Sequence, residues 1–134
     1  MYKINSAGGI TRVADGASIP PDMDNTDYKE YMAWVSSGNT TLPADPPSPQ
    51  ERGQAITAAI QGMLDAKAIS LRYDSVLSAR SYAGYSNPFQ AEALRLAVWA
   101  SACWAAAGVI EADVLAGRMA LPTVPQALAL MPGY

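Results

Sequence analysis

Hydrophobic residues follow two different patterns along this chain of 134 residues. Between residues 2 and 20 they lie in two short extended pieces, YKIN and ITRVADGASIP, which carry β-branched residues and are separated by the turn signal Gly8-Gly9. Beyond residue 26 they recur every three or four positions, as on one face of an amphipathic helix. The pattern therefore predicts a mainly α protein with a short N-terminal β-like arm.

The first predicted helix carries three aromatic side chains on or beside one face: Tyr28, Tyr31 and Trp34. Asp24, Asn25 or Thr26 can cap its start, and Gly38-Asn39 offers the left-handed backbone geometry that ends helices. A helix of about three turns is too short to be stable alone, so its aromatic face must pack on something. The alternatives are the helical part of the same chain and another polypeptide.

A proline-rich segment follows the aromatic helix. Its prolines enforce extended or polyproline geometry between about residues 42 and 49, so we expect a semi-rigid spacer there. The predicted organisation is a β-like arm with the aromatic helix over residues 1–41, a linker over residues 42–49, and a helical hairpin or small bundle over residues 50–134.

The second part of the chain begins with the helix-start signal SPQE. In this signal Ser48 can cap the helix, Pro49 suits the first helical position and Glu51 completes a capping box. The helix is predicted to run to about Arg72. Its apolar stripe consists of Ile56, Ile60, Met63 and Leu64, with Ala59 beside it.

The longest predicted helix starts at NPFQ, where Asn87 can cap, Pro88 can begin the helix and Gln90 can bond back. It ends near Ala116, before Gly117. One apolar row of this helix contains Leu94, Val98, Ala102, Ala105 and Val109. A second row contains Leu96, Trp99, Cys103, Ala106 and Ile110. Two apolar rows indicate a helix that is covered on more than one side.

Two shorter helical segments complete the prediction. Residues 73–88 suggest one or two helical turns that end near Gly84. Residues 122–131 suggest a final short helix, with Thr123 and Gln126 as its capping pair.

The charge pattern argues against two classes of partner. The net charge is −3, the isoelectric point is about 4.7, and the nine Lys and Arg residues form no cluster. Phosphate binding needs several cations on one face, so nucleic acid is not an expected ligand, and a membrane surface is disfavoured for the same reason. The uncharged segment 96–110 is shorter than the roughly 20 residues that span a bilayer. We therefore expect it in a buried helix.

Residue types that support catalysis are scarce. The chain has no histidine and one cysteine, Cys103, which lies in an apolar helix and is expected in the core. Asp22, Asp24 and Asp27 have the chemistry to hold Ca²⁺, but a full calcium-binding loop with its terminal Glu is missing, so capping and solvation are their expected roles. We predict no catalytic residue, no cofactor and no metal ligand. The alternative is a small metal-binding enzyme or a host-directed effector that uses the Asp22–Asp27 loop.

Aromatic residues carry the binding prediction. Trp99 and Trp104 lie in the long apolar helix and are expected in the core. Aromatic anchors with polar surroundings are instead the usual composition of a binding hot spot. The predicted partner-binding residues are Tyr28, Tyr31 and Trp34, with Tyr73, Tyr82 and Tyr85 of the irregular segment lining the same groove. Association with a second copy of the chain is a further prediction.

Two long segments resemble small tail proteins of bacteriophages and prophages. Residues 25–47, NTDYKEYMAWVSSGNTTLPADPP, resemble a recurrent motif with a polar start, an aromatic-x-x-aromatic-x-x-Trp helix, Gly-Asn-Thr and a proline-rich exit. Thr41 stands where a proline is common. The matching residues are Tyr28, Tyr31, Trp34, Gly38, Asn39, Thr40, Pro43 and the later prolines.

Residues 64–123 are similar to C-terminal regions of the same group. They share an Arg-Tyr-Asp turn, a Ser-Tyr-Ala segment, an Asn-Pro helix start, a Trp-x-x-x-Cys-Trp helix and a closing Gly-x-x-x-x-Pro-Thr. The matching residues are Arg72, Tyr73, Asp74, Ser81, Tyr82, Ala83, Asn87, Pro88, Trp99, Cys103, Trp104, Gly117, Pro122 and Thr123.

The resemblance implies a tail accessory protein of the tail-fibre assembly-like group, and it supplies no catalytic residue. The implied partner is a tail-fibre or a tail and baseplate polypeptide. The expected function is therefore that of a non-enzymatic phage tail protein, either a fibre assembly factor or a permanent structural adaptor of the virion. The segment MYKINSAGG lacks the pattern of a signal peptide. The expected location is the bacterial host cytoplasm during assembly, with the virion tail as the alternative.

Overall fold

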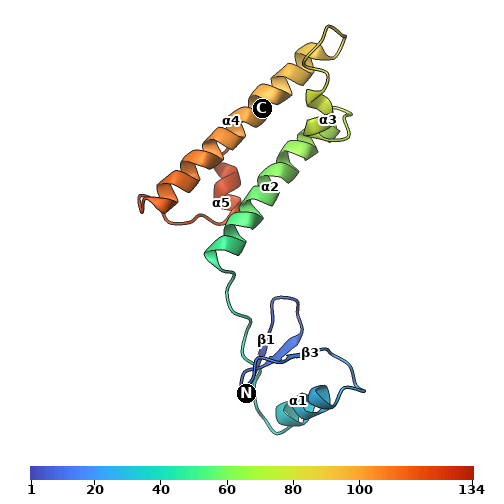
Figure 1. Ribbon diagram of the computed structural model, residues 1–134, viewed down its shortest axis with the longest axis vertical. Helices are drawn as coiled ribbons and strands as arrows, with labels where there is room; N and C mark the ends of the chain where they lie inside the picture. Colours follow the sequence, from blue (N-terminus) through green and yellow to red (C-terminus); the bar gives the residue numbers. More distant parts are fainter. The chain divides into compact units, whose positions relative to one another are not determined.

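The computed structural model describes residues 1–134 and divides them into two compact units, Met1–Pro47 and Ser48–Tyr134 (Figure 1). The division falls inside the predicted linker. The protein is mainly α, with 52% of its residues in five helices and a small three-stranded antiparallel sheet.

The sheet of the first unit has three strands: β1 (Tyr2–Ile4), β2 (Ile10–Arg12) and β3 (Ser18–Ile19). They pair in the order β1-β2-β3, with Tyr2 opposite Arg12 and Ile10 opposite Ile19. Gly8 supplies the positive φ of 82° that the first turn needs. The second extended piece of the sequence is thus two strands rather than one.

Helix α1 (Thr26–Ser36) packs against this sheet. Asn25 caps it by accepting a hydrogen bond from the Tyr28 N–H, and Gly38 follows it with a φ of 94°, as the sequence predicts. Tyr2, Ile10 and Ile19 form the small core under the helix. The sequence left open whether the aromatic face would pack on the helical part of the chain or on another polypeptide, and the structure shows that it packs on the N-terminal sheet.

The start of the proline-rich segment belongs to the first unit rather than to a free spacer. The Leu42 N–H donates to the Tyr2 carbonyl, and the Ile4 N–H donates to the Leu42 carbonyl, each over 2.9 Å. Lys3 also forms an ion pair with Asp45. Strand β1 therefore gains a partner on its second edge, which satisfies backbone groups that a lone sheet edge would leave to water.

The second unit contains α2 (Pro49–Ser70), α3 (Val76–Arg80), α4 (Gln90–Leu115) and α5 (Val124–Ala129). Helices α2 and α4 lie alongside each other, α3 packs on both near one end, and α5 packs on α2 (Figure 1). Gly117, with a φ of 72°, follows α4.

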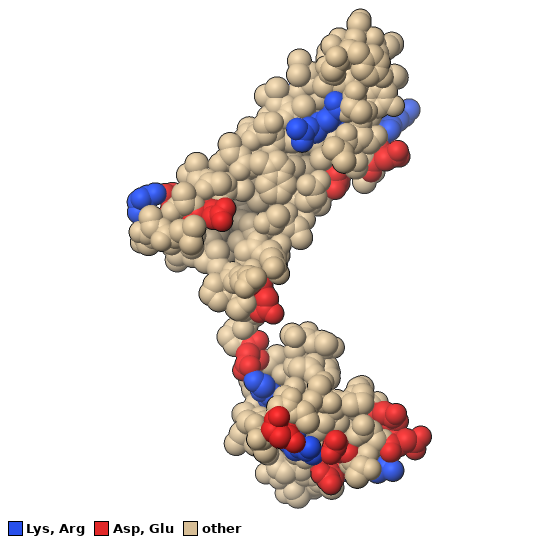
Figure 2. All heavy atoms as spheres, in the orientation of Figure 1, with Lys and Arg blue, Asp and Glu red and all other residues tan.

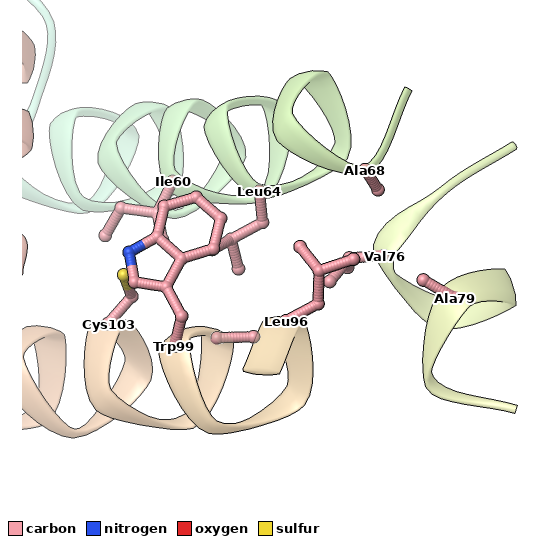
Figure 3. Packing of buried hydrophobic residues seen from close by; sticks show 9 residues of the cluster. Ile60, Leu64, Ala68, Val76, Ala79, Leu96, Trp99 and Cys103 are labelled. Carbon is pink, nitrogen blue, oxygen red and sulfur yellow. The ribbon is translucent and has the colours of Figure 1, made fainter. Parts of the chain in front are cut away.

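The core of this unit is formed by α2, α3 and α4. Figure 3 shows the Trp99 ring reaching from α4 toward Ile60 and Leu64 of α2. The predicted apolar stripe of α2 is confirmed, because Ile60 and Leu64 are buried. The second predicted row of α4 is also largely confirmed, since Leu96, Trp99 and Cys103 are buried. The buried residues are Ile60, Leu64, Ala68, Val76, Ala79, Leu96, Trp99, Ala100 and Cys103.

Two of the predicted helix starts in this unit are confirmed. The capping boxes of Ser48 with Glu51 and of Thr123 with Gln126 are both formed. The start predicted for the longest helix, at Pro88 with Asn87 as its cap, is wrong. Helix α4 begins at Gln90 without a side-chain cap.

The Asn87 side chain stabilises the turn before α4 rather than the first turn of the helix. Its Nδ2 donates to the carbonyls of Tyr82 and Tyr85, and its Oδ1 accepts from the Phe89 N–H. The Gln90 side chain donates to the Ala83 carbonyl instead of bonding back to the helix start.

The first predicted apolar row of α4 is exposed, which contradicts the expectation that the helix is covered on two sides. Leu94, Val98 and Val109 are 53%, 63% and 61% exposed. The reason is that α2 and α3 pack on the side of α4 that carries Leu96, Trp99 and Cys103, and α5 packs on α2. Helix α4 is long and apolar enough to cross a bilayer by length and composition, although five of its residues are buried in the core.

Candidate interaction surfaces

The predicted residues Tyr28, Tyr31 and Trp34 meet on the inner side of α1 and are half-buried. The Tyr31 ring lies edge-on to Tyr2, with ring centroids 5.2 Å apart, and the Tyr28 ring is tilted against Tyr31 at 5.8 Å. The Tyr31 hydroxyl shares a hydrogen bond of 2.8 Å with Thr41 Oγ1. These rings therefore stabilise their own unit, and only part of each ring is exposed and able to contact another polypeptide.

Arg12 joins β2 to α1 by ion pairs. Its guanidinium donates to Asp15 and to Asp27, each at 2.8 Å, and Glu30 lies at 3.8 Å. The hydrogen bond from Arg12 is the largest cause that lowers the pKa of Asp15. The Arg12 pKa is raised in turn, chiefly by its hydrogen bond to Asp15.

Two of the three aspartates at residues 22–27 bond within the chain through their carboxylates. Asp22 Oδ1 accepts from the Asp24 N–H, which makes a local turn, and Asp27 pairs with Arg12. No three His, Cys, Asp or Glu side chains lie close enough together to hold a metal ion. Asp22 and Asp27 thus have local structural roles.

Tyr73, Tyr82 and Tyr85 form a second aromatic group, in the other unit. The Tyr82 ring is its centre, with centroids 5.9 Å from Tyr73, 6.4 Å from Tyr85 and 5.8 Å from Phe89. Tyr85 and Phe89 are more than half exposed. We call these four residues the tyrosine cluster. Phe89 was not among the predicted binding residues. The sequence features that could have indicated it are that it is the single Phe of the chain and that it follows Asn87-Pro88.

The Tyr73 hydroxyl faces a carboxylate. It donates to Glu92 Oε1 over 2.9 Å. Burial, followed by this hydrogen bond, raises the pKa of Tyr73 to about 12. The hydroxyl therefore stays protonated and acts as a hydrogen-bond donor rather than as a base.

An apolar groove lies between α2 and α4. It has a volume of about 920 Å³, and no Lys or Arg lines it. Trp104, which the sequence placed in the core, is half-buried at this groove. Glu111 is its only charged lining residue. The other residues that define it include Ile56, Thr57, Ala107, Gly108 and Val114.

The ring of Tyr134 closes the core near Trp99, with the two centroids 5.5 Å apart. Lys67 and Arg95 each place their charge 4.3 Å from its centroid, within cation–π range. Trp99 Nε1 donates to the Pro132 carbonyl over 2.8 Å. This closing segment could not be predicted from the sequence pattern, because its contacts join residues more than 30 positions apart.

Cys103 lies deep in the same core. Burial raises the pKa of its thiol, and its Sγ lies 3.8 Å from the Pro132 carbonyl oxygen. The prediction that Cys103 is a core residue is confirmed. A buried protonated thiol is a poor nucleophile.

Charge is distributed unevenly between the units. Residues 1–47 contain three Lys and Arg but six Asp and Glu, whereas residues 48–134 contain six of each. Figure 2 shows that the visible face of the helical unit is mostly uncharged. The whole net charge of −3 therefore belongs to the first unit.

Each set of predicted site residues gathers within its own unit, one on α1 and one in the tyrosine cluster. No protein-family model, curated protein or solved structure matches the chain. Rings, aliphatic side chains and tyrosine hydroxyls dominate these surfaces, and such groups bind by burial and hydrogen bonding.

Proposed function

We propose that this chain is a non-enzymatic bacteriophage tail accessory protein that binds a tail-fibre or tail-tip polypeptide. The resemblance of residues 25–47 and 64–123 to small phage tail proteins supports the proposal. One structural observation carries it: Tyr85 and Phe89 remain 55% and 53% exposed although both pack on Tyr82. In this proposal, residues 48–134 form a helical hairpin scaffold that presents these rings.

Exposed rings that are already held in place suit protein recognition. Tyr82 fixes one side of Tyr85 and of Phe89, and the Asn87 side chain fixes the turn between them by donating to the Tyr85 carbonyl. Little rotational freedom remains to be lost on binding, which favours affinity. Aromatic side chains are also enriched among the residues that dominate binding energy.

The first unit contributes a second contact in this proposal. Tyr28, Tyr31 and Trp34 are half-buried by the sheet, so each offers only its outer edge to a partner. The chain then acts either as an assembly factor or as a permanent adaptor.

Co-expression of the full chain with the tail-fibre polypeptide encoded beside it tests the proposal, with the tag on the fibre polypeptide. We expect the two chains to co-purify. Replacement of both rings, Tyr85→Ala with Phe89→Ala, should lower the affinity at least tenfold, since aromatic hot-spot residues contribute about 2 kcal/mol or more each. The matched control is Leu77→Ala on α3, which removes an apolar side chain that is 74% exposed.

The outcomes are distinct. Circular dichroism should be the same for both variants, because all three side chains are more than half exposed. Equal binding by the double variant and the control would exclude the tyrosine cluster as the contact. Absence of a complex with every tail polypeptide would refute the function. A mass-spectrometric inventory of purified virions then separates the roles, because an adaptor remains in the particle in stoichiometric amounts and an assembly factor does not.

A further inference from the structure

The outer face of α4 is an exposed apolar surface that the proposed function does not use. Its large side chains are Leu94, Val98 and Val109, all more than half exposed, and the exposed Ala102 and Ala105 lie between them. Residues 96–110 contain no charged residue. We call this set the α4 outer face. Contiguous apolar surface of this kind on a soluble protein marks an interaction site.

Apart from Leu94, the residues of the α4 outer face follow the same order in both directions along the helix. Going along the helix, the residues are Val98, Ala102, Ala105 and Val109, and the midpoint falls between positions 103 and 104. If a second α4 lies antiparallel on the first about this midpoint, Val98 meets Val109 and Ala102 meets Ala105. A twofold axis repeats each contact, which is the defining property of an isologous interface. Small residues at the centre let the two backbones approach closely.

We propose that a second copy of this chain covers the α4 outer face, with the two α4 helices antiparallel across a twofold axis. The inference goes beyond binding of a tail polypeptide and does not depend on it.

Charge complementarity selects the antiparallel orientation. Arg95 and Asp113 are eighteen positions apart, which is about five helical turns, so both leave α4 on the same side. In the antiparallel pair Arg95 lies opposite position 112 of the second copy and hence beside its Asp113. Within one chain Arg95 forms no ion pair and only stacks on Tyr134. A parallel pair would place the two Arg95 side chains at the same level instead.

Net charge does not oppose the association, since residues 48–134 contain equal numbers of basic and acidic residues. The size of the surface sets the expected strength. From Leu94 to Asp113 the helix extends about 28 Å, and its width is about 10 Å. This strip is smaller than the roughly 800 Å² that each partner buries in a standard interface. We therefore expect a reversible dimer with a dissociation constant of about 10 µM.

Sedimentation velocity of the full chain between about 1 and 300 µM tests the proposal, a range that brackets that constant. The wild type should shift from monomer to dimer over this range. Val98→Lys should remain monomeric, because each new lysine would place a cation against the apolar Val109 of the other copy, while the helix tolerates Lys well. Leu77→Lys is the matched control and should dimerise normally, because Leu77 is 74% exposed on α3, outside the α4 outer face.

Two further measurements test the orientation. Arg95→Glu and Asp113→Arg should each weaken dimerisation, and the double variant should restore it, even though Asp113 also pairs with Arg118 at 2.8 Å. A nitroxide on Leu94→Cys should report a separation of about 28 Å between copies if the helices are antiparallel and about 10 Å if they are parallel. Buried Cys103 should stay unlabelled.

Three results would overturn the proposal. They are a wild-type chain that stays monomeric at the highest concentration, a dimer that Val98→Lys leaves intact, and a short nitroxide distance. A chain that stays monomeric but floats with zwitterionic phosphatidylcholine vesicles would assign the α4 outer face to a lipid surface instead.

Discussion

Tyr2 of β1 lies edge-on against Trp34 of α1, with ring centroids 5.1 Å apart and ring planes at 62°. Tyr31, which precedes Trp34 by about one turn of α1, contacts the same Tyr2 ring. The centroids of these two rings are 5.2 Å apart and the ring planes are at 69°. One ring near the N-terminus is therefore enclosed by two rings about 30 residues later. This contact explains how so short a helix stays folded beside so small a sheet, since edge-to-face pairs add stability beyond their buried area.

Tyr2→Ala should destabilise the first unit by about 3 kcal/mol, because it removes a buried ring and two aromatic contacts. Such a loss is a large share of the stability of a small unit. Urea unfolding followed by NMR signals of β1 and β2 measures it, while signals of α2 and α4 report the second unit separately.

The control for this prediction is Tyr2→Phe, which keeps the ring and should change the free energy of unfolding by less than about 1 kcal/mol. Equal stability of the alanine and phenylalanine variants would show that the ring contacts contribute little. The same contact predicts that Trp34→Ala also lowers the stability of the first unit. A loss of partner binding in that variant would therefore reflect this lower stability as well as a lost contact with the partner.

Acid should destabilise the first unit through Asp15. Its pKa is lowered in the folded state, chiefly by the hydrogen bond from Arg12, so the unfolded chain binds this proton more tightly than the folded chain does. The resulting stability is complete above the unfolded-state pKa of about 3.9 and is lost as the pH falls through the lower folded-state pKa. Urea titrations at pH values from about 6 to 2 measure this slope.

Asp15→Asn and Arg12→Gln should both reduce the acid dependence of the first unit, because each removes one partner of the pair. The second substitution also releases Asp27, so it should lower stability at neutral pH more than the first does. An unchanged slope in Asp15→Asn would show that other carboxylates dominate acid unfolding.

Two glycines of the second unit should respond oppositely to alanine. A Cβ at Gly62 in α2 meets no atom within 4 Å, so Gly62→Ala should stabilise the helix by about 1 kcal/mol. Gly117 has a φ of 72°, and Gly117→Ala should destabilise by about 1 kcal/mol because L-residues avoid this conformation. Thermal unfolding by circular dichroism compares them, and a shift of the same sign in both variants would contradict the argument.

Cys103 should resist thiol reagents in the folded protein. Its side chain is fully buried and its pKa is raised by that burial, so little thiolate forms and the reagent has no access. Reaction with a disulfide reagent at pH 8 should be slow for the native chain and complete within minutes in denaturant. Fast native labelling would show that the helical core opens readily.

The sequence by itself determined the ends of most elements and one face of α2. The caps at Ser48 and Thr123, a polar cap within residues 24–26 and the helix ends at Gly38 and Gly117 depend on groups within a few residues, so local pattern predicted them. The Asn87 side chain could either cap a helix or hold a turn, and the sequence alone does not distinguish these uses. In the structure it holds the turn before α4, where it bonds to Tyr82, Tyr85 and Phe89.

Only the tertiary structure decided which apolar surfaces are covered. The two apolar rows of α4 look equivalent in the sequence, yet one packs on α2 and α3 and the other faces solvent. The aromatic face of α1 likewise packs on a sheet formed by the first 19 residues. Burial depends on which distant segment reaches a surface, and helical periodicity describes a surface without specifying what covers it.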